Sequence, residues 1–137
     1  MLGIDWQTGV VAWKFEDADR EFPVLASAAV SADCVIVGGR DKRLRRFDPG
    51  GGQVRWTFIA KGRIDSSPVI VGQRVLFGAT DGILYAVDLA SGKESWRFDT
   101  GSSLTAAPAV GDGCLVIGDH DGVIRCFGAP AAPPRKR

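Results

Sequence analysis

The sequence lacks long apolar runs, which bears on its relation to membranes. No uninterrupted apolar stretch approaches the roughly 18 residues that a membrane-spanning helix needs. The N-terminus also lacks a basic segment followed by an apolar one, so no signal peptide is expected. We therefore expect no direct membrane insertion, and the chain carries no sign of its compartment.

The sequence also lacks an excess of positive or negative charge. The 17 Lys and Arg residues nearly balance the 16 Asp and Glu residues, and the net charge is +1. Domains that bind nucleic acids are usually strongly basic. No nucleic-acid partner is therefore expected.

Cysteine and histidine are scarce. The three cysteines, Cys34, Cys114 and Cys126, have no zinc-type spacing, and His120 is the single histidine. The motifs G-x-S-x-G, H-E-x-x-H and the P-loop are absent. We expect no catalytic, metal-binding or cofactor-binding residues, and hence no enzyme. The cysteines lie beside apolar runs, where we expect small buried side chains, with a redox or intermolecular role as the alternative.

Glycine is plentiful, with 18 residues, and it marks a repeat of about 40 residues. Three segments, Gly38–Lys42, Gly78–Gly82 and Gly118–Gly122, share an aspartate at the fourth position, and these aspartates are 40 residues apart. A second series places a tryptophan four residues after a glycine and two before a phenylalanine. The aspartates are Asp41, Asp81 and Asp121, and the tryptophans are Trp13, Trp56 and Trp96.

Each repeat predicts four short strands. In the middle copy the expected strands cover residues 68–71, 74–77, 83–87 and 94–98, and no helical period is present. Asp81–Gly82 predicts a type I′ hairpin turn, because Asp-Gly suits two central residues with positive φ. Four antiparallel strands in 40 residues make one blade of a β-propeller. The predicted fold class is therefore all-β, built from four-stranded propeller blades.

The pattern Leu84–Asp88, Gly92–Lys93, Trp96–Phe98 resembles the PQQ-like repeat of quinoprotein-type propellers and of outer-membrane assembly lipoproteins of the BamB type. The resemblance covers residues 2–128. From this resemblance, a true quinoprotein dehydrogenase is expected to hold the quinone with adjacent cysteines, a catalytic aspartate and acidic calcium ligands. This chain has no adjacent cysteine pair. PQQ is therefore not expected in this segment.

The repeats predict where the blades lie. Residues 1–15 are expected to supply the outer strand of a preceding or closing blade. Residues 16–58 and 59–98 are expected to form complete blades, 99–128 a blade without its outer strand, and 129–137 a disordered tail. Three blades are fewer than the usual four to eight. Two hypotheses stay open: the chain is the C-terminal piece of a longer propeller, or copies of it complete a ring.

The repeated residues have expected structural roles. The three tryptophans should pack between blades. The three aspartates, with Gly82 and Gly122, should form hairpin turns, and His120 should lie at a solvated turn tip. The segment at residues 40–46 departs from the repeat, because it is strongly basic, and it is a candidate contact for a partner. The alternative is that its charges only keep an edge strand soluble. Its cations are Arg40, Lys42, Arg43, Arg45 and Arg46.

Function is therefore predicted as a non-catalytic PQQ-like propeller module that acts as a protein-interaction scaffold. The resemblance implies bacterial envelope assembly or a sensor domain, and it favours the periplasm or cell envelope. The partner is expected to be another protein or further copies of the chain. The alternative is the C-terminal fragment of a PQQ-dependent quinoprotein dehydrogenase.

Overall fold

A computed structural model of the chain describes residues 1–17 and 22–128. All regular secondary structure in these ranges is β, which confirms the predicted class. The strands are β1 (Leu2–Ile4), β2 (Val11–Lys14), β3 (Ala29–Ser31), β4 (Cys34–Gly38), β5 (Arg43–Phe47), β6 (Val54–Ile59), β7 (Val69–Val71), β8 (Arg74–Gly78), β9 (Ile83–Asp88), β10 (Glu94–Asp99), β11 (Ala109–Gly111), β12 (Cys114–Gly118) and β13 (Ile124–Gly128). Within the same ranges, no helix is long and apolar enough to cross a membrane.

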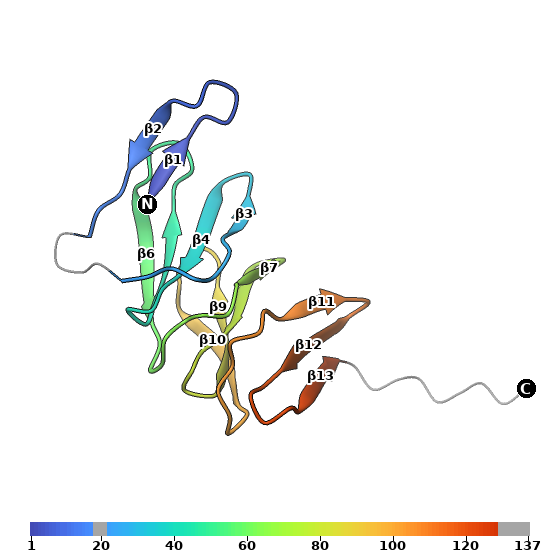
Figure 1. Cartoon of the computed structure of the whole chain (residues 1–137). Helices are drawn as coiled ribbons and strands as arrows, with labels where there is room; N and C mark the ends of the chain where they lie inside the picture. The colour runs from blue at the N-terminus through green and yellow to red at the C-terminus, as the bar shows by residue number, and fades with distance from the viewer. Residues whose placement is uncertain (18–21, 129–137) are drawn as a thin grey trace, which may run out of the picture.

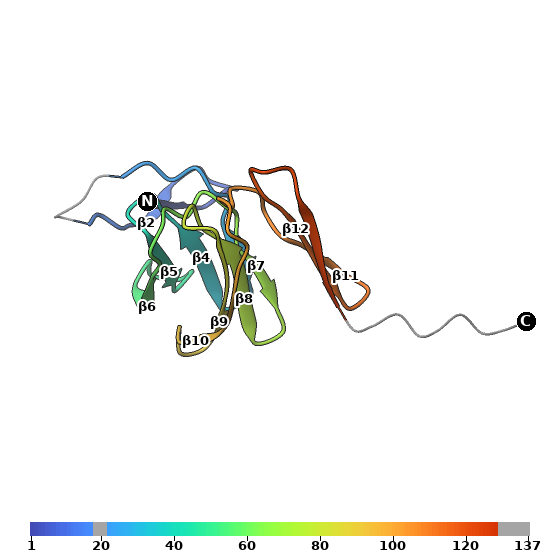
Figure 2. The same cartoon turned by 90° about the horizontal axis from the view of Figure 1, so that it is seen from below.

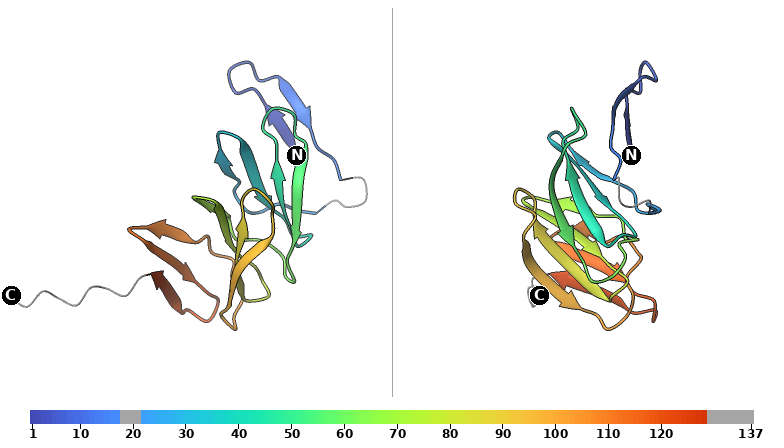
Figure 3. Two further views of the ribbon diagram at one scale, coloured as in Figure 1. Left: turned by 180° about the vertical axis from the view of Figure 1, so that it is seen from behind. Right: turned by 90° about the vertical axis from the view of Figure 1, so that its left-hand side faces the viewer.

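The strands form four antiparallel sheets in which neighbours along the chain are neighbours in the sheet. Two sheets, β3–β6 and β7–β10, have four strands each, while β1–β2 has two and β11–β13 has three. The sheets follow one another along an arc from the N-terminal hairpin to β13 (Figure 1). This is an arc of propeller blades that does not close, and the hairpin and β13 lie at its opposite ends (Figure 3).

The strands of the middle sheet form where the apolar runs predict them. The predicted runs 68–71, 74–77, 83–87 and 94–98 correspond to β7, β8, β9 and β10 within one residue at each end. Five consecutive residues of β9, from Ile83 to Val87, are buried. Strand β9 is covered on both faces, with Tyr85 in one core and Leu84 in the other, and its sequence is therefore continuously apolar rather than alternating.

The prediction of a type I′ turn at Asp81–Gly82 is wrong. Gly82 has φ +83°, but Asp81 is not among the residues with positive φ. The Gly82 N–H donates to the Ala79 carbonyl at 3.1 Å. This is a longer hairpin loop, in which a turn is followed by one left-handed residue. Two consecutive positive φ values, 49° and 73°, occur instead at Asp112–Gly113, between β11 and β12.

Hydrophobic cores lie between the sheets, which face one another (Figure 2). One core joins β3–β6 to β7–β10, and the other joins β7–β10 to β11–β13. Buried members of the first include Cys34, Ile36, Leu44, Ile64, Val75, Phe77, Tyr85 and Val87. The buried members of the second are Leu84, Leu104, Leu115 and Ile117.

The repeated tryptophans lie at these junctions. The indole N–H of Trp56 donates to the Leu89 carbonyl of the next sheet at 2.9 Å, and the ring covers Gly92 so closely that a Cβ there would lie 2.5 Å from it. The indole of Trp13 donates to the Pro49 carbonyl at 2.8 Å, one repeat earlier. Trp96 meets the next sheet through Phe127, with ring centroids 5.7 Å apart. Trp6, outside the series, is 88% exposed.

Two sequence predictions concern residues outside the described ranges. The disordered tail at 129–137 lies entirely outside them. The predicted blade at 16–58 lies partly outside them, at residues 18–21.

Candidate functional site: a groove across the turns of three repeats

The turn between the second and third strand of each sheet lies against the loop that enters the neighbouring sheet. The loop between β6 and β7 bonds to the turn before it, with Ile64 N–H donating to Gly39 at 3.1 Å. The same loop accepts from the turn after it, with Thr80 N–H donating to Arg63 at 2.9 Å. The next loop repeats both bonds, through Leu104 to Ala79 and from His120 to Ser103. Backbone hydrogen bonds thus join turns and loops into one continuous strip.

A groove of about 650 Å³ runs along this strip. Its walls come from equivalent positions of successive repeats, which the 40-residue spacing brings side by side. They are the loop positions Leu25, Asp65 and Thr105, the turn positions Arg40, Thr80 and His120, and the pair Arg63 and Ser103.

An ion pair lines one end of the groove. Arg40 donates to both carboxylate oxygens of Asp65, from Nε at 2.9 Å and from Nη2 at 3.1 Å. The Asp65 side chain is only 11% exposed. A bidentate pair of this kind is rigid, because the planar guanidinium matches the carboxylate. It ties the turn of one sheet to the loop of the next, and it neutralises this end of the groove.

The other end carries hydroxyls and the single histidine. His120 Nε2 lies 2.8 Å from Thr105 Oγ1, and the imidazole is exposed. In the middle, the Thr80 hydroxyl accepts the backbone N–H of Arg63 at 2.9 Å, while the Arg63 residue is itself exposed. The groove therefore offers hydroxyl groups, an imidazole and one accessible guanidinium.

The structure distributes the predicted basic contact residues over different surroundings. Arg45 pairs with Asp17 and Asp41, and Arg43 lies 3.5 Å from Asp17. Arg46 points to the opposite face of β5, where it pairs with Asp33 and donates to the Leu89 carbonyl at 3.0 Å.

The other two predicted contact residues lie in the turn between β4 and β5. Arg40 lines the groove, and Lys42 is exposed with φ 66° at the repeat position that Gly82 occupies in the next turn. The five cations therefore do not form one surface.

The first two repeated aspartates hold the hairpin turns. Asp41 and Asp81 each accept the backbone N–H of the residue two positions later, at 3.2 Å and 3.1 Å. Asp81 also accepts the Tyr85 hydroxyl at 2.7 Å and the Gly62 N–H at 3.1 Å. Burial and the Asp81 carboxylate raise the pKa of Tyr85 to about 12, because both disfavour the phenolate.

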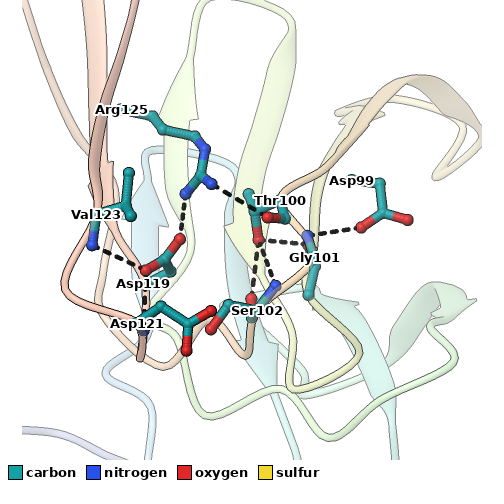
Figure 4. Close-up of polar contacts among 9 residues, drawn as sticks. Asp99, Thr100, Gly101, Ser102, Asp119, Asp121, Val123 and Arg125 are labelled. Atoms are coloured by element: carbon teal, nitrogen blue, oxygen red, sulfur yellow. Dashed lines mark hydrogen bonds and ion pairs between the residues drawn. The ribbon is translucent and has the colours of Figure 1, made fainter.

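In the third hairpin this role belongs to Asp119 (Figure 4). Its carboxylate accepts the N–H groups of Asp121 and Val123, both at 3.0 Å, and it pairs with Arg125. Arg125 also donates to the Thr100 carbonyl at 3.1 Å. The Arg125 guanidinium is the main reason that the pKa of Asp119 lies below its usual value.

Spacing alone singled out Asp121 in this hairpin and missed Asp119. Asp121 contributes its backbone N–H to the turn and is exposed. Arg125 is the sequence signal that could have identified Asp119. It occupies the position of Tyr85 in an otherwise apolar strand, where a guanidinium favours a nearby carboxylate as its partner.

Metal ligands do not gather in the described ranges. No group of three or more His, Cys, Asp or Glu residues is placed there to hold a metal ion. The three repeated aspartates lie in turns of separate sheets. The carboxylates of Asp41 and Asp81 accept backbone N–H groups of their own turns, whereas Asp121 takes part through its backbone N–H, which donates to Asp119.

Together these features define an open arc of four-stranded β-propeller blades whose turns form a shared groove. A family model described as outer membrane protein assembly factor BamB matches residues 1–129, and the chain belongs to this family of PQQ-type repeats. No curated protein matches the sequence.

Solved structures share the fold. BamB from Moraxella catarrhalis has a TM-score of 0.80 and 25% identity over 91% of this chain and 42% of its own. Quinohemoprotein alcohol dehydrogenase ADHIIG from Pseudomonas putida HK5 has a TM-score of 0.75 and 22% identity, covering 86% of this chain and 20% of its own. The quinohemoprotein alcohol dehydrogenase from Comamonas testosteroni has a TM-score of 0.71 and 26% identity, covering 79% and 20%. The chain thus spans less than half the length of each.

Proposed function

We propose that this chain is a non-catalytic propeller module that binds an extended segment of a partner protein in the groove across its turns. The observation that carries the proposal is the recurrence of lining positions from three successive repeats along one groove of about 650 Å³. A groove that crosses several equivalent units suits an elongated ligand, because each unit contacts a successive part of it.

The charges of the groove favour an acidic segment. Arg40 and Asp65 neutralise each other, which leaves Arg63 as the charge that faces solvent in the middle. Ser103, Thr105 and Thr80 add hydroxyls along the same wall. The backbone of the strip is already hydrogen-bonded to itself, so a bound peptide would be recognised by these side chains rather than by strand addition.

The family supports a binding role in the cell envelope. Its model is named for an assembly factor of the outer membrane, and the BamB structure is similar over most of this chain. Envelope assembly and ligand sensing are both compatible with a module that binds a peptide and performs no reaction.

Peptide titration tests the proposal. Labelled acidic, neutral and basic peptides are titrated against the chain, and fluorescence anisotropy reports binding. We expect the acidic peptide to bind most tightly and the charge reversal Arg63→Glu to abolish that preference. Arg97→Glu is the matched control, because Arg97 is exposed on the outer strand β10, away from the groove. Equal binding of all three peptides, or equal effects of the two variants, would contradict the proposal.

The competing hypothesis is a piece of a quinone-dependent dehydrogenase, and this segment by itself does not contain the residues that would hold the quinone. The resemblance implies adjacent cysteines and acidic calcium ligands, whereas the described residues hold no acidic cluster and the chain has no adjacent cysteines. We propose that the chain binds no PQQ by itself. Titration with the quinone and calcium should leave the quinone absorption spectrum unchanged, and a tight spectral change would favour the dehydrogenase.

Self-association is a second proposal, carried by the uncovered ends of the arc. At one end Leu2 and Ile4 are about half exposed, and at the other Ile124 is 75% exposed. Two different apolar ends favour a head-to-tail contact between copies. Light scattering should report a mass above that of one chain, and Ile124→Lys should lower it. A monomer at every concentration would exclude this proposal without affecting the groove.

A further inference from the structure

Two cysteines lie together on one face of the last sheet, away from the groove. Strands β12 and β13 pair so that Val116 is opposite Cys126 and Cys114 is opposite Gly128. Residues opposite each other share a face, and so do residues two apart in one strand. Cys114 and Cys126 are therefore diagonal neighbours on the same face.

This face is turned away from the preceding sheet. Leu115 and Ile117 of β12 are buried against Leu84 and Leu104. Alternation along the strand directs Cys114 and Val116 to the opposite side. There Cys126 is exposed and Cys114 is half-buried, so a reagent in solution can reach the pair.

The sulfur of Cys114 leans across Gly128. A Cβ at Gly128 would lie 2.9 Å from Cys114 Sγ, so the absence of a side chain leaves the space that the thiol occupies. The neighbouring Cys114 thiol and, to a lesser degree, desolvation raise the pKa of Cys126.

Strand β13 can adjust to a covalent link. Diagonal neighbours in a sheet have Cα atoms about 7–8 Å apart, slightly beyond the usual range for disulfides. In the described part of the chain β13 pairs with β12 alone, so its other edge imposes no register. A disulfide between the two cysteines therefore requires a shift of this edge strand, because Cα atoms more than about 7 Å apart cannot be bridged without backbone movement.

We propose that Cys114 and Cys126 form a redox-switchable disulfide that fastens the edge strand β13 to β12. The oxidant is a small-molecule or protein disulfide. The exposed Cys126 loses its proton and attacks the oxidant, one sulfur of which leaves as a thiolate and is protonated. The Cys114 thiolate then attacks the mixed disulfide at Cys126 and expels the second sulfur. The cysteines lose two protons and two electrons, and the oxidant takes them up to become two thiols.

Cys34 provides a matched control within the same fold. It occupies the position of Cys114 two repeats earlier, is fully buried, and has Arg46 at the position that corresponds to Cys126. The proposal therefore predicts that Cys34 stays reduced while the other two cysteines react together.

The test treats the folded full chain with oxidised glutathione at mildly alkaline pH, because the raised pKa of Cys126 slows its attack at neutral pH. Trypsin cleaves after Arg125, so the two cysteines fall on separate peptides that only a disulfide can join. We expect the joined peptides from the wild type and from Cys34→Ala. We expect none from Cys126→Ser, whose fold is checked by circular dichroism.

Thermal unfolding gives a second readout. Oxidation should raise the Tm of the wild type and of Cys34→Ala, because the link restricts the unfolded chain. It should leave the Tm of Cys126→Ser unchanged. Glutathione held on Cys126 without ring closure, pairing that includes Cys34, or three unreacted thiols would each overturn the proposal.

Discussion

The middle sheet and the last sheet differ most at one repeat position. Leu44, Leu84 and Ile124 occupy this position in successive repeats, and all three are large and apolar. Leu44 and Leu84 are 0% exposed, whereas Ile124 is 75% exposed. The sequence is equivalent in all three copies, so burial depends on whether another sheet covers that face. In a repeat protein much of the stability lies in these contacts between neighbouring units.

The tryptophans show a related difference. Trp13 and Trp56 each donate to a carbonyl of the following sheet. The indole of Trp96 has no acceptor among the described residues, and its ring packs on Phe98 and Phe127. Each tryptophan keeps the same register in its own sheet, since Trp13, Trp56 and Trp96 lie opposite Gly3, Arg46 and Ala86. The neighbouring sheet therefore decides whether the indole N–H finds an acceptor.

The largest expected effect comes from truncating the covered position. Leu84→Ala should lower the free energy of unfolding by about 2–5 kcal/mol, because it leaves a cavity between two sheets. Ile124→Ala should change it by less than about 0.5 kcal/mol, because the side chain is already largely in water. Urea unfolding followed by tryptophan fluorescence measures both. Similar losses would mean that another surface covers Ile124 in solution.

A smaller effect is expected from removing one indole hydrogen bond. Trp56→Phe should cost about 1 kcal/mol through the lost bond to Leu89, in addition to any loss of packing. The Leu89 carbonyl keeps its bond from Arg46, which limits the loss. Trp96→Phe is the control and should cost less. Equal losses in urea unfolding would contradict the distinction between the two sites.

Alkaline pH should test the buried Tyr85. Its pKa is raised from 10 to about 12 in the folded state, so unfolding favours the phenolate and stability falls as pH rises from about 10 to 12. Tyr85→Phe removes the ionisable hydroxyl, so the free energy of unfolding of this variant should fall less over the same pH range. Parallel pH profiles for the two proteins would show that Tyr85 titrates normally. Thermal unfolding at a series of pH values provides the measurement.

The third hairpin should depend on Asp119 rather than on Asp121. Asp119→Asn weakens the pairing with Arg125, and we expect a modest fall in Tm. Asp121→Asn should leave the Tm nearly unchanged, because Asp121 contributes its backbone N–H to the turn. The difference between the variants should shrink at acidic pH, as protonation of Asp119 removes the same carboxylate. A larger effect at Asp121 would restore the role that the 40-residue spacing predicted.

Prediction from the sequence was most successful for the strands. The apolar run at 83–87 marks β9, for example, because β9 is buried between two sheets. The turn at Asp81–Gly82 was predicted with the wrong type, since loop length, and not the dipeptide alone, decides which residues need positive φ. The candidate site was only partly predictable. Arg40 and His120 were noted, but the loop residues Arg63 and Ser103 became neighbours of these turns only on folding.

The basic segment around Arg45 was the least predictable feature. In the sequence it stands out as a concentration of positive charge, because most of its acidic partners lie outside the segment. Asp17 and Asp65 reach it from other loops and pair with Arg45 and Arg40. Long-range pairs of this kind have no local signal.

The sequence by itself determined the repeat, the strands and the all-β class, because the alternation of short apolar runs and turn residues is a local property. The tertiary structure alone decided which equivalent residues are buried, which aspartate holds the third hairpin, and which loop residues form the groove. These depend on the sheet that lies beside each repeat. Two positions with the same residue type, such as Cys34 and Cys114, therefore differ in burial because their neighbours differ.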